Sequence, residues 1–294
     1  YNVSESIDIS GYFEKGIVFE GAGMGEYDMA SRLESDDAEH RGISGDYTVI
    51  RFISPDKVPN NIIDCRANNA SVKNMTLISG DYGEKTSKFN MWVKGKNITL
   101  DSIRMIKIDL RDLNPDNSAP LGTTGNMMID NLSDTIKILN CDFHSQAACI
   151  SVFYNQGIYG WGEFSDDYRI KNIKIDGCNF YGYATNSYKR LTALGRSQQA
   201  GESSAAVRAS GCERVSIENC TMQGYDREHA KTLTRTLYVA QGGRKFYAAN
   251  NIQHNVGKHT SSDADGNTGE QWLFHGGDAP GIFDVSYASG KNIT

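Results

Sequence analysis

An eight-residue segment that recurs along the chain in degenerate form constrains the fold most strongly. Its clearest copy is Val215-Ser216-Ile217-Glu218-Asn219-Cys220-Thr221-Met222. Further copies, two that keep the Cys and three fainter ones, begin at Ile173, Ile136, Ile98, Met75 and Phe246. In the copy at Phe246, Asn251 takes the place of the Cys. Apolar residues at every second position are typical of a β-strand, and the polar step before the Cys indicates a corner where the chain turns.

A second short apolar run precedes most of these copies, at 91–93, 127–129, 150–153, 205–207, 237–239 and 272–274. A strand, a corner, a second strand, another corner and a return loop form one coil of a solenoid. Because one coil cannot bury its own inner face, successive coils have to stack and build a parallel sheet. We therefore predict an all-β, single-stranded parallel β-helix. Two inward files are expected in its core, formed by Cys141, Cys178 and Cys220 and by Phe143, Phe180 and Met222.

The composition agrees with one elongated domain over residues 1–294. Of the 294 residues, 39% are hydrophobic, which suffices for a continuous core. The net charge of -6 argues against a general nucleic-acid binder, and no apolar run approaches the length of a membrane span. Residues 291–294 repeat residues 96–99, the start of a coil. We expect the chain to be a fragment of a longer β-helix, whose remainder or a second chain covers the C-terminal sheet edge.

The cysteines and the glycosylation sequons each have two interpretations. The repeating cysteines are expected to be small core residues, with a disulfide between Cys149 and Cys212, or bonds within the file, as the alternative. Asn-x-Ser/Thr sequons occur at Asn2, Asn69, Asn74, Asn97, Asn131, Asn219 and Asn292. They are either glycosylation sites or a by-product of the repeat. In the second case Asn74, Asn97 and Asn292 share one corner, where Asn tolerates left-handed backbone geometry and forms side-chain ladders.

The early turn Gly21-Ala22-Gly23-Met24, followed by units such as Lys96-Asn97-Ile98-Thr99-Leu100, resembles the pectin-lyase-like superfamily of right-handed parallel β-helices. The resemblance covers about residues 16–294 and concerns the repeat pattern. It implies a secreted or cell-surface protein that acts on polysaccharide. The motifs of polygalacturonases, pectate lyases and epimerases are absent, so the resemblance assigns no catalytic residue and no subfamily.

Long irregular segments are expected on one flank of the solenoid, and the acidic stretch from Asp263 to Asp278 is the most suggestive of them. Glycoside cleavage needs a carboxylic acid and a second carboxylate. Glu270 is the candidate acid, and Asp263 or Asp265 its partner. The same segment has two other interpretations: Asp263, Asp265 and Asn267 have the spacing of calcium ligands, and the whole stretch is also compatible with a solvated turn. Otherwise no cofactor is expected.

Cationic and aromatic residues are expected beside this segment. Alignment of the coils on Val152, Val207, Val239 and Phe274 predicts that Arg235 lies beside Glu270 and that Arg208 shares a column with His275. Arginine next to these groups favours a sugar that carries carboxylate or sulfate. The aromatic segment 154–168 and the strand at 272–274 offer rings for sugar stacking, namely Tyr159, Trp161 and Trp272, although the alternation also allows Trp272 to be core.

Three functions follow from these residues. The first is a glycoside hydrolase that uses Glu270 with Asp263 or Asp265. The second is a polysaccharide lyase that acts on a uronate-containing glycan, with Arg208 or His275 near the abstracted proton. The third is a glycan-binding β-helix without catalysis, such as a tailspike or an adhesin.

Overall fold

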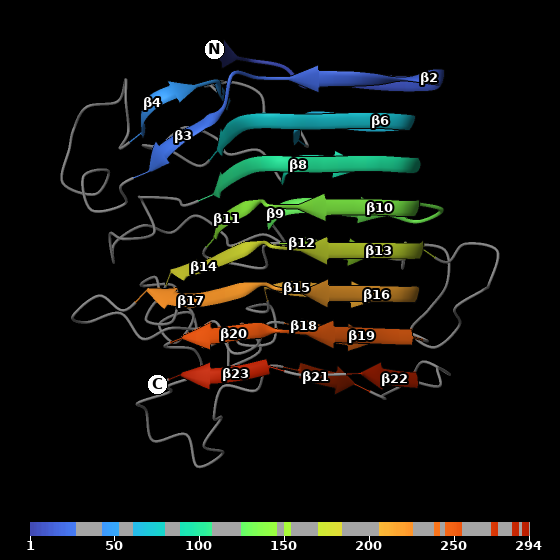
Figure 1. The fold of residues 1–294 in the computed structure, drawn as a ribbon. Helices are drawn as coiled ribbons and strands as arrows, with labels where there is room; N and C mark the ends of the chain where they lie inside the picture. The colour runs from blue at the N-terminus through green and yellow to red at the C-terminus, as the bar shows by residue number, and fades with distance from the viewer. Residues whose placement is uncertain are drawn as a thin grey trace, which may run out of the picture.

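The computed structural model describes residues 1–27, 43–52, 61–79, 89–107, 125–145, 150–153, 170–183, 206–225, 238–241, 245–254, 272–275, 284–287 and 290–293. These residues form strands and turns, without a helix. All but two of the strands join one continuous sheet of parallel pairings, so the predicted all-β parallel β-helix is confirmed. The coils stack from the N-terminus at one end to the C-terminus at the other (Figure 1).

The pairings divide the strands into three stacks, each formed by one strand from every coil. The first stack contains β2 (Ile7–Glu20), the start of β6 (Asn61–Ser79), β7 (Phe89–Val93), β9 (Gly125–Asp130), β12 (Ile150–Phe153), β15 (Val207–Ser210), β18 (Tyr238–Gln241) and β21 (Trp272–His275).

The second stack continues from the later parts of β2 and β6 to β8 (Lys96–Lys107), β10 (Asp134–Leu139), β13 (Ile170–Asp176), β16 (Cys212–Glu218), β19 (Lys245–Ala249) and β22 (Asp284–Tyr287). The third stack contains β1 (Asn2–Val3), β5 (Val49–Phe52), the ends of β6 and β8, β11 (Asp142–Ser145), β14 (Asn179–Tyr183), β17 (Thr221–Tyr225), β20 (Asn251–His254) and β23 (Gly290–Ile293).

Inward side chains form files down the tube, as the repeat predicts. Phe143 is in register with Phe180, and Phe180 with Met222. All three are at most 1% exposed, and the two phenyl rings stack at 5.3 Å between centroids. The files share one continuous cluster of buried residues. Since Phe180 is in register with Phe143 of the preceding coil and with Met222 of the next coil, the core exists only when the coils stack.

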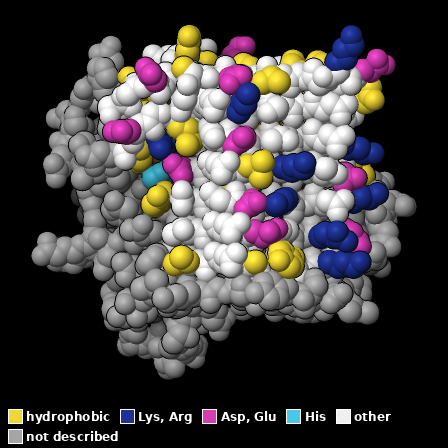
Figure 2. Space-filling model, viewed as in Figure 1, with side chains coloured by type: hydrophobic (Ala, Val, Ile, Leu, Met, Phe, Trp, Pro, Cys, Tyr) yellow, Lys and Arg dark blue, Asp and Glu magenta, His cyan; other side chains and the backbone are white. Residues whose placement is uncertain are grey.

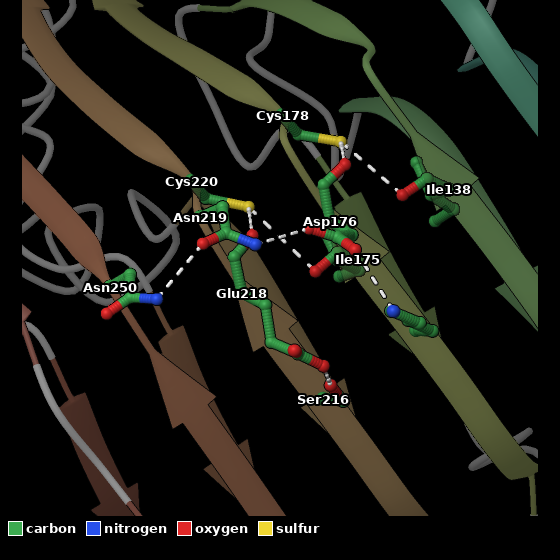
Figure 3. Close-up of polar contacts among 10 residues, drawn as sticks. Ile138, Ile175, Asp176, Cys178, Ser216, Glu218, Asn219, Cys220 and Asn250 are labelled. Carbon is green, nitrogen blue, oxygen red and sulfur yellow. Dashed lines mark hydrogen bonds and ion pairs between the residues drawn. The ribbon is translucent and has the colours of Figure 1, made fainter.

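The predicted cysteine file is confirmed. Cys141, Cys178 and Cys220 occur in equivalent coil positions, are almost fully buried and are free thiols. The Cys178 thiol donates to the Ile138 carbonyl of the preceding coil, 3.5 Å away (Figure 3). Burial raises the pKa of Cys178 well above its ordinary value. These thiols therefore act as small core residues. Cys149 lies outside the described residues, so its pairing with Cys212 stays a prediction.

Asn251 ends this file and replaces the thiol with two hydrogen bonds. Its Oδ1 accepts from the Cys220 amide at 2.9 Å, and its Nδ2 donates to the Ile217 carbonyl at 2.8 Å. The side chain is 1% exposed. A buried amide is tolerated here because both of its polar ends are bonded to backbone.

Left-handed residues form the corner between the second and third stacks. The column consists of Asn74, Ser102, Asn140, Gly177, Asn219 and Asn250, with φ between 51° and 65°. Asn219 Nδ2 donates to Asp176 Oδ1 at 2.8 Å and Asn250 Nδ2 donates to Asn219 Oδ1 at 3.2 Å, which links three coils (Figure 3). Asn suits the position because it adopts left-handed geometry at lower cost than most residues.

The register corrects two details of the sequence prediction. The repeat copy aligned with Ile98 begins at Ala70 and not at Met75. Asn74 and Asn97 do not share a corner: Asn97 follows Lys96, is aligned with Asn69 at the corner between the first and second stacks, and donates to Asn69 Oδ1 at 3.0 Å. Asn292 lies within β23 beside Gln253. The error arose because both corners use Asn before an apolar alternation.

Candidate functional site

The first stack carries three of the residues that the sequence places in the site. Arg208 is in β15, and Trp272 and His275 are in β21. Their backbone positions are described. The other predicted site residues lie outside the described residues: Glu270, Asp263, Asp265, Arg235, Trp161 and Tyr159.

The strand register overturns the predicted alignment of this stack by one or two residues. Val207 pairs with Ile150 and with Tyr238, and Tyr238 pairs with Trp272. Arg208 therefore shares a column with Val239 and Leu273, whereas His275 pairs with Gln241. The two are not in one column. The pairing of Val239 with Leu273 also removes the alignment that placed Arg235 beside Glu270. Short apolar runs of unequal length allow several registers in sequence, and hydrogen bonding selects one.

Polar and aromatic side chains that the sequence did not single out cover the outside of the same stack. Met91 and Val93 are buried inward, and Trp92 alternates with them and is only half-buried. In register with Trp92 are Asp64 in the preceding coil and Met128 in the next, and this column continues through Ser151 to Arg208. The tryptophan thus marks the same face as the predicted Arg208.

Trp92 is held in place by a buried ring. It packs edge to face on Phe89, with 6.1 Å between centroids and an interplanar angle of 84°, and Phe89 is 1% exposed. Aromatic pairs of this geometry are favourable beyond the area that they bury. An indole fixed at a partly exposed position is suited to contact the apolar face of a sugar ring.

A cation and hydrogen-bonding oxygens lie beyond Trp92. Lys94 Nζ lies 3.4 Å from Asp130 Oδ2 and donates to Asn131 Oδ1 at 3.2 Å. In the preceding coil, Arg66 contacts Asp64 through two nitrogens, at 2.6 and 2.9 Å. The Lys94 and Arg66 side chains are 39% and 58% exposed, so these ion pairs contribute little to stability. They leave charged groups at the surface that can bind hydroxyls and carboxylates.

These residues, Asp64, Arg66, Trp92, Lys94, Asp130 and Asn131, are named here the Trp92 face. Only the period-two alternation 91–94 pointed to them in the sequence, because it turns Trp92 and Lys94 outward. Among the described residues no group of three or more His, Cys, Asp or Glu side chains is placed to hold a metal ion. The calcium interpretation concerns residues 263–267, which lie outside them. No helix in the described parts of the chain is long and apolar enough to span a membrane.

A second cluster, under the hairpin of β3 (Met24–Tyr27) and β4 (Ile43–Tyr47), is structural. Arg104 Nη1 donates to the carbonyls of Met24 and Gly25 at 3.1 and 2.9 Å, and its Nη2 contacts Asp142 at 3.0 Å. Tyr27 packs on His144, which is 5% exposed. Arg104 is thereby committed to fastening the hairpin to the third stack, and this cluster is not a candidate site.

Comparison with known proteins gives little beyond the fold. No protein-family model and no curated protein match the sequence. An alginate lyase from Paenibacillus sp. str. FPU-7 is similar in structure at 10% identity and a TM-score of 0.47, over 97% of this chain and 92% of the lyase chain. The Streptococcus pneumoniae surface protein and adhesin PfbA has 10% identity and a TM-score of 0.29, over 100% and 90% of the two chains. These scores are too low to carry an argument about function.

Proposed function

We propose that this chain is a secreted or cell-surface carbohydrate-active protein that binds a polysaccharide along the Trp92 face. The observation that carries the proposal is the combination of the half-buried indole of Trp92 with the ammonium of Lys94 and the carboxylate of Asp130 on adjoining coils. Sugar binding uses an apolar ring face and surrounding hydroxyls, and this set matches both. The face runs along a stack whose strands are about 4.8 Å apart, which suits an extended chain of sugars.

We further propose that the protein cleaves glycosidic bonds. In the hydrolase version Glu270 protonates the leaving oxygen, and Asp263 or Asp265 acts as base or nucleophile, with His275 close to the reaction. Arg208, Arg235, Tyr159, Trp161 and Trp272 are then the substrate contacts. The support is the position of Arg208, Trp272 and His275 in strands of the first stack and the acidic composition of segment 263–278.

The second candidate is a lyase that acts on a uronate-containing glycan. Lys94 on the Trp92 face and Arg208, which is in the column of Trp92 three coils further on, favour it, because β-elimination requires that the uronate carboxylate is neutralised by cations. His275 is its candidate base. A binding protein without catalysis is the remaining alternative.

One panel experiment separates these functions. The protein is incubated with neutral and acidic polysaccharides, and the products are assayed for new reducing ends and for the ultraviolet absorbance of unsaturated uronates. A hydrolase gives reducing ends alone, and a lyase gives both signals. Glu270→Gln should remove hydrolase turnover and leave the circular dichroism spectrum unchanged. Binding without any product would refute cleavage, and unaltered binding after Trp92→Ala would remove the Trp92 face from the proposal.

A further inference from the structure

A groove lies on a different face of the solenoid, on the outside of the second stack. It has a volume of about 400 Å³ and is lined by Arg214 and Ser216 of β16 and by Lys245, Phe246 and Tyr247 of β19. Sites that bind small molecules have volumes of about 300–1,000 Å³. Phe246 is 2% exposed and belongs to the hydrophobic core, whereas Tyr247, the next residue, is 37% exposed.

Two cations stand opposite each other in this groove. Arg214 pairs in register with Lys245, and both side chains are exposed. Like charges directly opposite on neighbouring strands are unfavourable. Within the described part of the chain neither side chain forms an ion pair. The backbone position paired with Lys245 in the next coil is that of Asp284. Lys and Arg side chains are numerous over β10, β13, β16 and β19, where they are interspersed with Asp and Glu (Figure 2). An anion between Arg214 and Lys245 would relieve their repulsion.

The rest of the groove is suited to a sugar. Tyr247 is in register with Ser216, so a phenol and a hydroxyl lie beside the cation pair. Ser216 donates its hydroxyl hydrogen to Glu218 and keeps oxygen lone pairs that can accept from a ligand (Figure 3). A tyrosine ring packs on the apolar face of a sugar, whereas a guanidinium grips a carboxylate with two parallel hydrogen bonds.

A carboxylate of the protein lies next to the groove: Glu218 accepts the hydroxyl hydrogen of Ser216, which lines it. Glu218 and Asp176 are in register with each other, one position beyond the inward residues Ile217 and Ile175. Partial burial by itself raises the pKa of Asp176, but hydrogen bonds from Asn219 and Lys174 outweigh it and lower the pKa. Carboxylate oxygens can accept hydrogen bonds from hydroxyls and disfavour additional anions beside them. The border therefore accepts the hydroxyl edge of a sugar and disfavours a sulfated one.

We propose that this groove is a second binding site, for a carboxylate-bearing sugar unit of a glycan, separate from the Trp92 face. The carboxylate lies between Arg214 and Lys245, the ring packs on Tyr247, and hydroxyls face Ser216 and Glu218. Such a site holds an acidic polysaccharide against the wall of the solenoid without taking part in its cleavage.

Calorimetry with short oligogalacturonates tests the proposal, with oligogalactans and sulfated carrageenan oligomers as comparison ligands. The variant Arg214→Gln with Lys245→Gln should weaken oligogalacturonate binding by about tenfold or more, because charged hydrogen bonds are lost. The matched control, Lys137→Gln with Lys171→Gln, removes the same charge from exposed positions of the second stack outside the groove. It should change binding by less than about twofold.

Tyr247 distinguishes ring packing from charge attraction. Tyr247→Phe should keep most of the affinity and Tyr247→Ala should lose it. Equal losses in the two charge variants would reduce the effect to general electrostatics and overturn the proposal, as would equal affinity for oligogalactan. Binding that is lost in Trp92→Ala but untouched by every groove variant would also overturn it and leave the proposed function standing.

Discussion

The left-handed corner at Asn219 makes a quantitative prediction possible, because two variants separate its backbone and side-chain contributions. Asn219 has a φ of 52° and bonds to Asp176 and Asn250. Alanine in left-handed geometry costs about 1.5 kcal/mol, and two exposed hydrogen bonds contribute together roughly 1.5 kcal/mol. Asn219→Ala should therefore lower the free energy of unfolding by about 3 kcal/mol.

Asn219→Gly removes the same hydrogen bonds, but glycine adopts left-handed geometry without backbone strain. Greater freedom of the unfolded chain costs it roughly 0.7 kcal/mol, so its loss should be about 2 kcal/mol. Gly177, in the same column at a φ of 65°, is the matched control. Gly177→Ala adds backbone strain, and its Cβ would lie 2.9 Å from Asn140 Oδ1. This variant removes no side-chain amide and therefore tests the backbone contribution separately. It should also destabilise.

Urea unfolding followed by circular dichroism measures these differences. Equal losses for Ala and Gly at Asn219, together with a neutral Gly177→Ala, would refute the assignment of strain to this corner. The pH dependence is a second check. The folded-state pKa of Asp176 is lowered, so its stabilisation is present above the unfolded pKa of about 3.9 and is lost as the pH falls through the folded pKa. The gap between wild type and Asn219→Ala should narrow in acid.

Three further predictions concern the core and the hairpin. Phe180→Ala should cost about 3–5 kcal/mol in urea unfolding, because it opens a cavity in the stacked file, and a loss below about 1 kcal/mol would contradict the packing. Cys178 should resist alkylation in the native protein at pH 8 and react in urea, since burial raises its pKa; rapid native labelling would refute its burial. Arg104→Met should increase amide hydrogen exchange in β3 and β4 while β13 and β16 stay protected, and unchanged exchange in the hairpin would show that Arg104 does not fasten it.

The repeat in the sequence was sufficient to predict the architecture. Alternation inside each copy defines which side chains face inward. Identical residues at equivalent positions, such as Cys141, Cys178 and Cys220, indicate how one coil aligns with the next. Asn251 was also recognised as the equivalent of a Cys. These inferences hold because a solenoid is built from contacts between neighbouring copies, so local sequence reports directly on the core.

The site was less accessible to such reasoning. The first stack consists of short apolar runs without a marker residue, and the alignment on Val239 and Phe274 missed the true register. Trp92 was assigned only to the apolar run 91–93 and Lys94 belongs to no motif, so neither was recognised as part of a binding surface. The groove at Arg214 and Lys245 was overlooked because these residues are 31 positions apart in the sequence. They become neighbours only through the pairing of β16 with β19, and no local pattern connects them.

The sequence alone determined that this chain forms stacked parallel coils with inward files of Phe, Met and Cys, because periodicity is a local property. Only the tertiary structure decided which outward residues become neighbours. A run in which every residue is apolar, such as 237–239, matches its neighbours in more than one strand pairing, and the pairing that forms places Arg208 in the column of Leu273, two residues before His275. Surface chemistry depends on that register, which the hydrogen bonds between coils fix.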